Sequence, residues 1–98
     1  MAFRLIFTTE GRDQLRGLAA DETKLKRVRR CLGLLETDPK YPGLNSHKYS
    51  GVRSLDGRDL WESYVENRTP AAWRVFWCYG PDAAEITIVA ITAHPYLI

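Results

Sequence analysis

The chain has 98 residues, of which 45% are hydrophobic and 27% charged, so we expect one small globular domain spanning residues 1–98. No stretch approaches the ~20 apolar residues that cross a bilayer, and the N-terminus lacks the layout of a signal peptide, so we expect a cytoplasmic protein without membrane contact. The net charge is only +2, but 12 of the 14 Lys and Arg residues precede residue 59, and this basic half could approach nucleic acid.

The first two elements are predicted to be a strand and a short helix. Phe3, Leu5 and Phe7 alternate with neighbours that are only partly polar, since Ile6 is one of them, and this is the period-2 pattern of a half-buried strand. The hydroxyl of Thr9 can accept a hydrogen bond from an unpaired backbone N–H, so Thr9 is a suitable N-cap. The helix after it is expected to end near Ala20.

A second amphipathic helix is predicted after Asp21, another capping residue. Its apolar stripe recurs at spacings of three and four: Leu25, Val28, Leu32 and Leu35. Pro39 and Pro42 end it, because proline lacks the N–H and clashes with the preceding turn. Two consecutive helices with so short a join predict an αα-hairpin. The basic run from Lys24 to Arg30 is interpreted as a solvated helix face, with contact to ribosomal RNA as the alternative.

The connection over residues 38–58 is polar and contains Gly and Pro. Loops of about 20 residues are uncommon in compact domains. Its length therefore indicates either a binding segment or a short strand that the pattern does not reveal.

Three strands follow, at residues 60–66, 71–79 and 85–92, and turn-forming segments separate them at residues 67–70 and 80–82. An antiparallel meander is the simplest topology. The expected fold is therefore α+β, with an N-terminal strand and an αα-hairpin packed on an antiparallel meander, in the order β-α-α-β-β-β.

The two cysteines, Cys31 and Cys78, have no CxxC spacing and are expected to be free, buried thiols. His47 and His94 are the only histidines, and the carboxylates show no ligand spacing. Metal chemistry is thus disfavoured, and no cofactor is expected.

Several local motifs make the whole chain resemble the RelE/ParE toxin superfamily. They are His47-Lys48-Tyr49-Ser50-Gly51, Trp61, Trp73-Arg74-Val75-Phe76-Trp77 and His94-Pro95-Tyr96. The resemblance implies a RelE-like domain and a toxin of a type II toxin–antitoxin system that cleaves mRNA on the ribosome. Founding-type members carry lysines where this chain has Glu62 and Tyr64 and Arg where it has His94, while other ribonuclease branches use a Glu, an Arg and a terminal His/Tyr set.

Cleaving RNA without a metal requires a base for the 2′-hydroxyl, a cation for the phosphate and an acid for the leaving oxygen. The expected catalytic residues are Arg74, His94, Tyr96 and Glu62. Arg74 could hold a phosphate, and His94 could transfer the proton. Tyr96 could stack on a base or orient a proton, and an ionised Glu62 could be a general base.

Each of these residues also has an ordinary structural explanation. Arg74 could lie over apolar surface with its head in water, and His94 could simply be exposed. Tyr96 could cap the edge of the core. Glu62 could form a cross-strand pair with Arg74.

The expected RNA-binding residues are His47, Lys48, Arg53 and Tyr64. Cationic side chains in the connection would contact phosphates and supply affinity without sequence choice. The alternative is a solvated loop.

Two other functions remain open: a ParE-like inhibitor of DNA gyrase, and a catalytically inactive binding protein of the same fold. The resemblance also implies a cognate antitoxin as partner, with the toxin a monomer when free and part of a hetero-oligomer when bound. Exposed apolar residues beside the sheet, including Leu97 and Ile98, could receive an antitoxin helix or strand.

Overall fold

The computed structural model describes residues 2–54, 56–69 and 71–96. The expected antitoxin contact at Leu97 and Ile98 lies outside the described residues, as does Pro70 of the expected turn. Among the described helices, none has both the length and the apolar character needed to cross a membrane.

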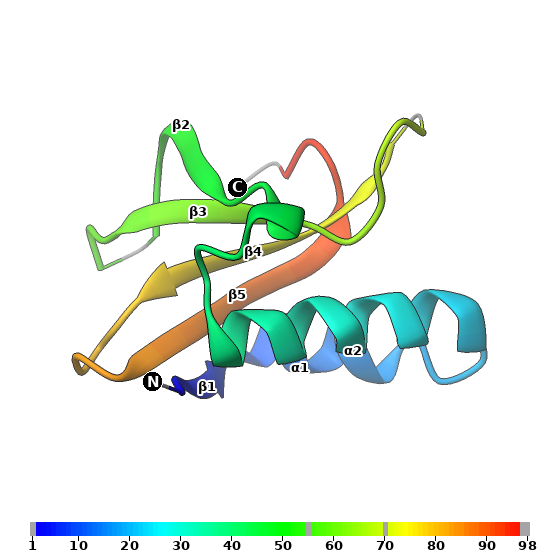
Figure 1. The fold of residues 1–98 in the computed structure, drawn as a ribbon, viewed down its shortest axis with the longest axis horizontal. Coiled ribbons are helices and arrows are strands. Elements are labelled where there is room, and N and C mark those ends of the chain that lie inside the picture. The colour runs from blue at the N-terminus through cyan, green and yellow to red at the C-terminus, as the bar shows by residue number, and fades with distance from the viewer. Residues whose placement is uncertain (1, 55, 70, 97–98) are drawn as a thin grey trace.

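Two helices pack on a mixed five-stranded sheet (Figure 1). The elements are β1 (Arg4–Phe7), α1 (Thr9–Arg16), α2 (Glu22–Thr37), a 3₁₀ turn η1 (Pro42–Leu44), β2 (His47–Arg53), β3 (Asp59–Tyr64), β4 (Trp73–Tyr79) and β5 (Glu85–Ala93). The strand order is β1-β5-β4-β3-β2, with β1 parallel to β5 and the other pairs antiparallel. The predicted α+β class and the meander β3-β4-β5 are confirmed.

The expected N-cap of α1 was one residue too late. The cap is Thr8, whose Oγ1 accepts from the N–H of Gly11 at 3.0 Å and also donates to the carbonyl of Val89 at 2.7 Å. Thr8 therefore joins the helix start to β5, a tertiary contact that local pattern cannot show. The helix ends at Arg16, earlier than the expected Ala20.

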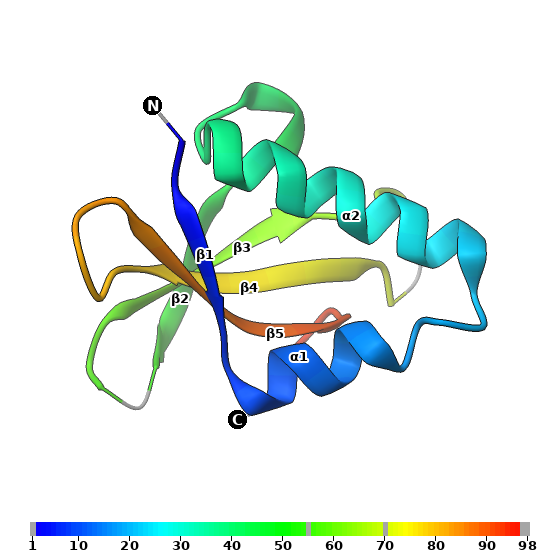
Figure 2. The same ribbon diagram turned by 90° about the horizontal axis from the view of Figure 1, so that it is seen from below.

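Helix α2 follows the prediction closely. The Asp21 carboxylate accepts from the N–H of Lys24, and the predicted stripe contributes Val28, Leu32 and Leu35 to the core. This stripe packs on one face of the sheet, against side chains such as Trp77. Figure 2 shows α2 lying across that face, with α1 beside β5.

The expected long loop contains a strand, β2, at the edge of the sheet. His47 pairs with Glu62 and Lys48 with Trp61, and the register then shifts before Arg53 pairs with Asp59. Gly51 lies within this irregular stretch with φ +77°, a backbone that glycine adopts without steric cost. The irregularity breaks the alternation by which a strand is recognised from sequence.

The face of the sheet opposite the helices carries a smaller apolar cluster of Leu60, Phe76, Cys78 and Ala90, covered partly by Tyr49 and Tyr96. Cys31 and Cys78 are free and buried, as predicted. Burial is the main cause that raises the pKa of Cys31, to about 12, and the charge of Arg30 only partly opposes it. Because no helix covers it, this second face, here called the open face, is where polar side chains gather.

Candidate active site

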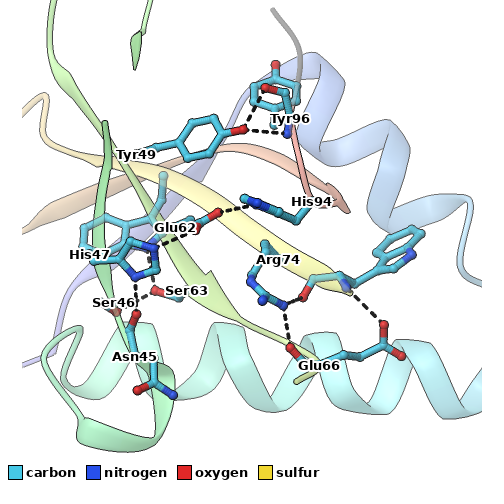
Figure 3. Close-up of polar contacts among 12 residues, drawn as sticks. Asn45, Ser46, His47, Tyr49, Glu62, Ser63, Glu66, Arg74, His94 and Tyr96 are labelled. Carbon is cyan, nitrogen blue, oxygen red and sulfur yellow. Dashed lines mark hydrogen bonds and ion pairs between the residues drawn. The ribbon is translucent and has the colours of Figure 1, made fainter. Parts of the chain in front are cut away.

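A buried carboxylate lies at the centre of the open face. Glu62 is on β3, between β2 and β4, and its side chain is only 5% exposed. Its Oε1 lies 2.6 Å from Nε2 of His47, and its Oε2 lies 3.1 Å from Nδ1 of His94. Figure 3 shows the two imidazoles pointing at Glu62 from two sides. Since a buried charge is costly without partners, these contacts explain how a carboxylate is kept here.

The two histidines reach Glu62 by different routes. His47 is the cross-strand neighbour of Glu62, so register alone places it. His94 comes just after β5 ends at Ala93; its N–H bonds to the carbonyl of Ala72, and its ring turns back over the open face. Their side chains are 47% and 43% exposed, so both imidazoles can be reached from solvent.

Hydrogen bonding assigns the two histidines different roles. Nδ1 of His47 lies 2.7 Å from the carbonyl of Asn45, and its Nε2 faces the Glu62 carboxylate. A backbone carbonyl and a carboxylate are both acceptors, so both ring nitrogens of His47 face acceptors. Nδ1 of His94 also faces the Glu62 carboxylate, and a neutral ring that donates from Nδ1 has its lone pair on Nε2. That Nε2 forms no hydrogen bond with the described residues.

Arg74 shares the open face with this cluster but is held tightly. Its guanidinium carbon lies 3.7 Å from the centre of the Tyr64 ring, and Nη1 donates to the carbonyls of Glu66 and Trp73. The residue is only 9% exposed, and Nε has no hydrogen-bond partner. The alternative of a head in water is therefore wrong. The alternative of a Glu62–Arg74 pair is also wrong, because Phe76 stands opposite Glu62 and Tyr64 opposite Arg74.

Glu66 connects the Arg74 end of the face to α2. Its carboxylate accepts from the N–H of Trp73 at 3.1 Å, from Lys24 at 3.1 Å and from Arg27 at 3.3 Å. Burial alone would raise the pKa of Glu66, but these hydrogen bonds and the two positive charges outweigh it and leave the pKa below its ordinary value. Glu66 is not among the residues expected from the sequence, because its partners lie up to 42 residues away.

Tyr96 lies against the middle of the open face, packed on Phe76 with ring centres 5.0 Å apart. Its backbone N–H donates to the hydroxyl of Tyr49, whose ring also contacts His94. The Tyr96 hydroxyl donates to Glu10 at 2.9 Å. Burial, together with this bond to an anionic acceptor, raises the pKa of Tyr96 to about 12. Tyr96 thus keeps its proton near neutral pH, which suits a donor and not a base.

Lys48 and Arg53 lie on the edge strand, not in a solvated loop. Both are more than 60% exposed, and both pair with Asp59, at 3.3 Å each. Lys48 follows His47 directly on β2, with its ammonium 5.9 Å from the centre of the Trp61 ring, whereas Arg53 lies at the other end of the strand. Tyr64 lies beside the histidine cluster, with its ring centre 6.1 Å from that of His47.

The structure thus brings Glu62, His94, His47, Arg74 and Tyr96 to one face, and leaves Lys48 and Arg53 at its edge. His47 was expected to contact phosphate, and its contact with Glu62 was not predicted. Among the described residues, no group of three His, Cys, Asp or Glu side chains has an arrangement suited to holding a metal ion.

Comparisons with known proteins give relatives by structure only, since neither a family model nor a curated protein matches the chain. A YoeB/ParE toxin from Agrobacterium tumefaciens superposes with a TM-score of 0.73 at 11% identity, covering 94% of this chain and 99% of that one. A metal-bound toxin from Helicobacter pylori gives 0.71 at 18% identity, covering 100% of both chains.

A third similar structure comes from an archaeal RelE-RelB complex of Pyrococcus horikoshii, with a TM-score of 0.69, 16% identity and coverage of 99% of this chain and 100% of that one. At these identities the likeness establishes the architecture. The two helices, the parallel β1–β5 pair and the antiparallel strands up to β2 make this chain an example of the RelE-like toxin fold.

Proposed function

We propose that this protein is the toxin of a type II toxin–antitoxin pair and that it cleaves mRNA by general acid/base catalysis without a metal. The observation that carries the proposal is the His47–Glu62–His94 cluster, exposed to solvent on the open face. The RelE-like fold supports it as an analogy of architecture.

His94 is the proposed base. Glu62 holds the Nδ1–H of His94, so Nε2 keeps its lone pair and points away from the carboxylate. A carboxylate that fixes the tautomer of a histidine and stabilises its protonated form is a recurring catalytic arrangement. His47 has both nitrogens occupied, so we assign it to holding Glu62 in place and not to proton transfer.

The proposed reaction is an in-line transfer within the RNA strand. His94 Nε2 takes the proton of the 2′-hydroxyl, and the 2′ oxygen bonds to phosphorus as the bond from phosphorus to the 5′ oxygen breaks. Tyr96 gives the leaving oxygen its proton, which His94 returns through water. The products are a 2′,3′-cyclic phosphate and a 5′-hydroxyl.

Arg74 supplies positive charge at the same face. Because it is stacked on Tyr64 and bonded to two carbonyls, its position is fixed before the substrate arrives. Preorganised charge needs no rearrangement as the phosphate becomes more negative. Lys48 and Arg53 would then contact phosphates of mRNA or ribosomal RNA.

The antitoxin belongs to the proposal as well. Structures of the same fold are described as toxin–antitoxin complexes, among them RelE-RelB and DinJ-YafQ. A free toxin of this size would otherwise act on the cell that makes it, so we propose that a cognate antitoxin binds it and holds it inactive.

The test is to induce the protein in cells and map the 5′ ends of transcripts. The proposal expects new ends at regular positions within codons, carrying 5′-hydroxyl groups. His94→Gln should remove them, while Lys26→Ala, on the exposed side of α2, should not. Double-strand DNA breaks without RNA cuts would favour the gyrase inhibitor instead, and neither effect would favour the inactive binding protein.

A further inference from the structure

A pocket of about 440 Å³ opens beside the histidine cluster. It lies between the first turn of α1, strand β5 and the segment that joins β2 to β3, and Thr9, Val89 and Tyr96 are among its walls. Carbon atoms make up most of its exposed surface, but its lining residues include two carboxylates, those of Glu10 and Asp56. Its volume is in the range of roughly 300–1,000 Å³ typical of small-molecule sites. Of its walls, the proposed reaction uses only the Tyr96 hydroxyl.

Tyr96 joins the pocket to the cluster. One end of this residue is tied to Tyr49, which contacts the His94 ring. The other end, the hydroxyl, lies beside Glu10 at the wall of the pocket. The distance from the cluster to the pocket is therefore about the length of one tyrosine side chain. An RNA strand with one phosphate at His94 would have this pocket close beside that phosphate.

Two guanidinium groups flank the pocket. Arg58 is fixed, since it bonds to Asp56 at 2.7 Å, to the carbonyl of Tyr79 at 3.0 Å and to the hydroxyl of Thr87 at 3.3 Å. Arg53 is 68% exposed, and its pairing with Asp59 at 3.3 Å leaves it accessible to a phosphate. Apolar walls with cations beside them match the two parts of a nucleotide, a flat base and a charged phosphate.

We infer that this pocket holds one nucleobase of the RNA strand, adjacent to the cleaved bond, with Arg53 beside the next phosphate. The inference rests on the proposed function, since it places the scissile phosphate at His94. The carboxylates of Glu10 and Asp56 disfavour a free anion in the pocket, whereas a base is uncharged and can stack on an aromatic ring such as that of Tyr96.

The test uses a short single-stranded RNA copied from a mapped cut site, with 2′-O-methyl sugars so that it binds without being cleaved. One base at a time is removed along the strand, and affinity is measured by fluorescence anisotropy. Removing the base that enters the pocket should weaken binding about tenfold, as expected for one stacked base. Removing bases far from the cut should change little.

A variant with a filled pocket completes the test. Thr9 is exposed at the start of α1, so Thr9→Trp should fill the space without disturbing the core. This variant should bind the intact strand about as weakly as the wild type binds the strand lacking that base, with no further loss when the base is removed. Lys26→Trp, on the exposed side of α2, controls for the added ring and should behave as the wild type.

Two failures can be told apart. A wild type that cleaves RNA and binds the strand, but shows the same affinity wherever the base is removed, overturns the pocket and leaves the proposed function standing. The pocket is also overturned if removing that base weakens RNA binding by Thr9→Trp as much as it weakens binding by the wild type. A wild type that neither binds the strand nor produces new transcript ends in cells overturns both.

Discussion

Replacing Glu62 by glutamine tests the tautomer argument most directly. The amide keeps the shape of the side chain but offers one acceptor and one donor in place of two acceptors. His47 already gives one proton to the carbonyl of Asn45. The amide oxygen can accept a hydrogen bond from one histidine, and the amide N–H₂ must then face the ring nitrogen of the other. Either His47 presents an unprotonated Nε2, or the neutral form of His94 carries its proton on Nε2 and not on Nδ1.

Either outcome should reduce cleavage. If His94 carries its proton on Nε2, the proposed base is gone, and if His47 becomes neutral, the carboxylate that would stabilise protonated His94 is still missing. General acid/base catalysis contributes about 10²- to 10⁴-fold, so we expect the single-turnover rate of RNA cleavage to fall within that range.

Stability should change less. Each charge-assisted bond contributes about 1.5–3 kcal/mol, but glutamine also removes the cost of burying a charge on a residue that is 4% exposed. We therefore expect the free energy of unfolding to fall by no more than about 2 kcal/mol. Denaturant unfolding would measure it, with Glu36→Gln on the surface of α2 as the control. A folded Glu62→Gln protein that cleaves RNA at the wild-type rate would refute the assigned roles.

Three further predictions concern the scaffold. Because the pKa of Glu66 is lowered in the folded protein, its carboxylate stabilises the fold fully above the ordinary pKa of 4.5 and loses that effect as pH falls through the lowered pKa. The difference in unfolding free energy between the wild type and Glu66→Gln, measured in urea, should therefore disappear over that acid range. A difference that does not change with pH would contradict this prediction. Gly11→Ala should cost about 1–3 kcal/mol in thermal unfolding because the new Cβ would lie 2.9 Å from a backbone oxygen of β5, whereas Gly33→Ala, with nothing within 4 Å, should stabilise α2 by about 0.5–1 kcal/mol. The buried thiols of Cys31 and Cys78 should resist a thiol reagent in the native protein and react in urea, and fast native labelling would show that the core opens.

The sequence predicted the parts of the fold that repeat at a regular spacing. The stripe of α2 and the apolar strands β4 and β5 are strongly periodic, and their positions agree with prediction to within a few residues. The edge strand β2 was missed because its residues are mostly polar and its alternation is broken at an irregularity. A long expected loop was the only indication that a strand was present.

The candidate site was predicted as a set of residues but not as an arrangement. Arg74, His94, Tyr96 and Glu62 were expected together, and they do lie on one face. Their contacts depend on register and on the turn after Ala93, which sequence spacing does not determine. The bond from His47 to Glu62 spans 15 residues and that from His94 spans 32, so no local pattern joins them.

The parallel pairing of β1 with β5 bears on how the protein is made. Arg4 stands opposite Glu85 in the sheet, so a nascent chain carries β1 unpaired while most of the molecule is synthesised. His94 and Tyr96 come later still. A partly translated chain therefore contains neither the β1–β5 pair nor a complete cluster, so the contacts around Glu62 can form only after nearly all of the described residues have been made.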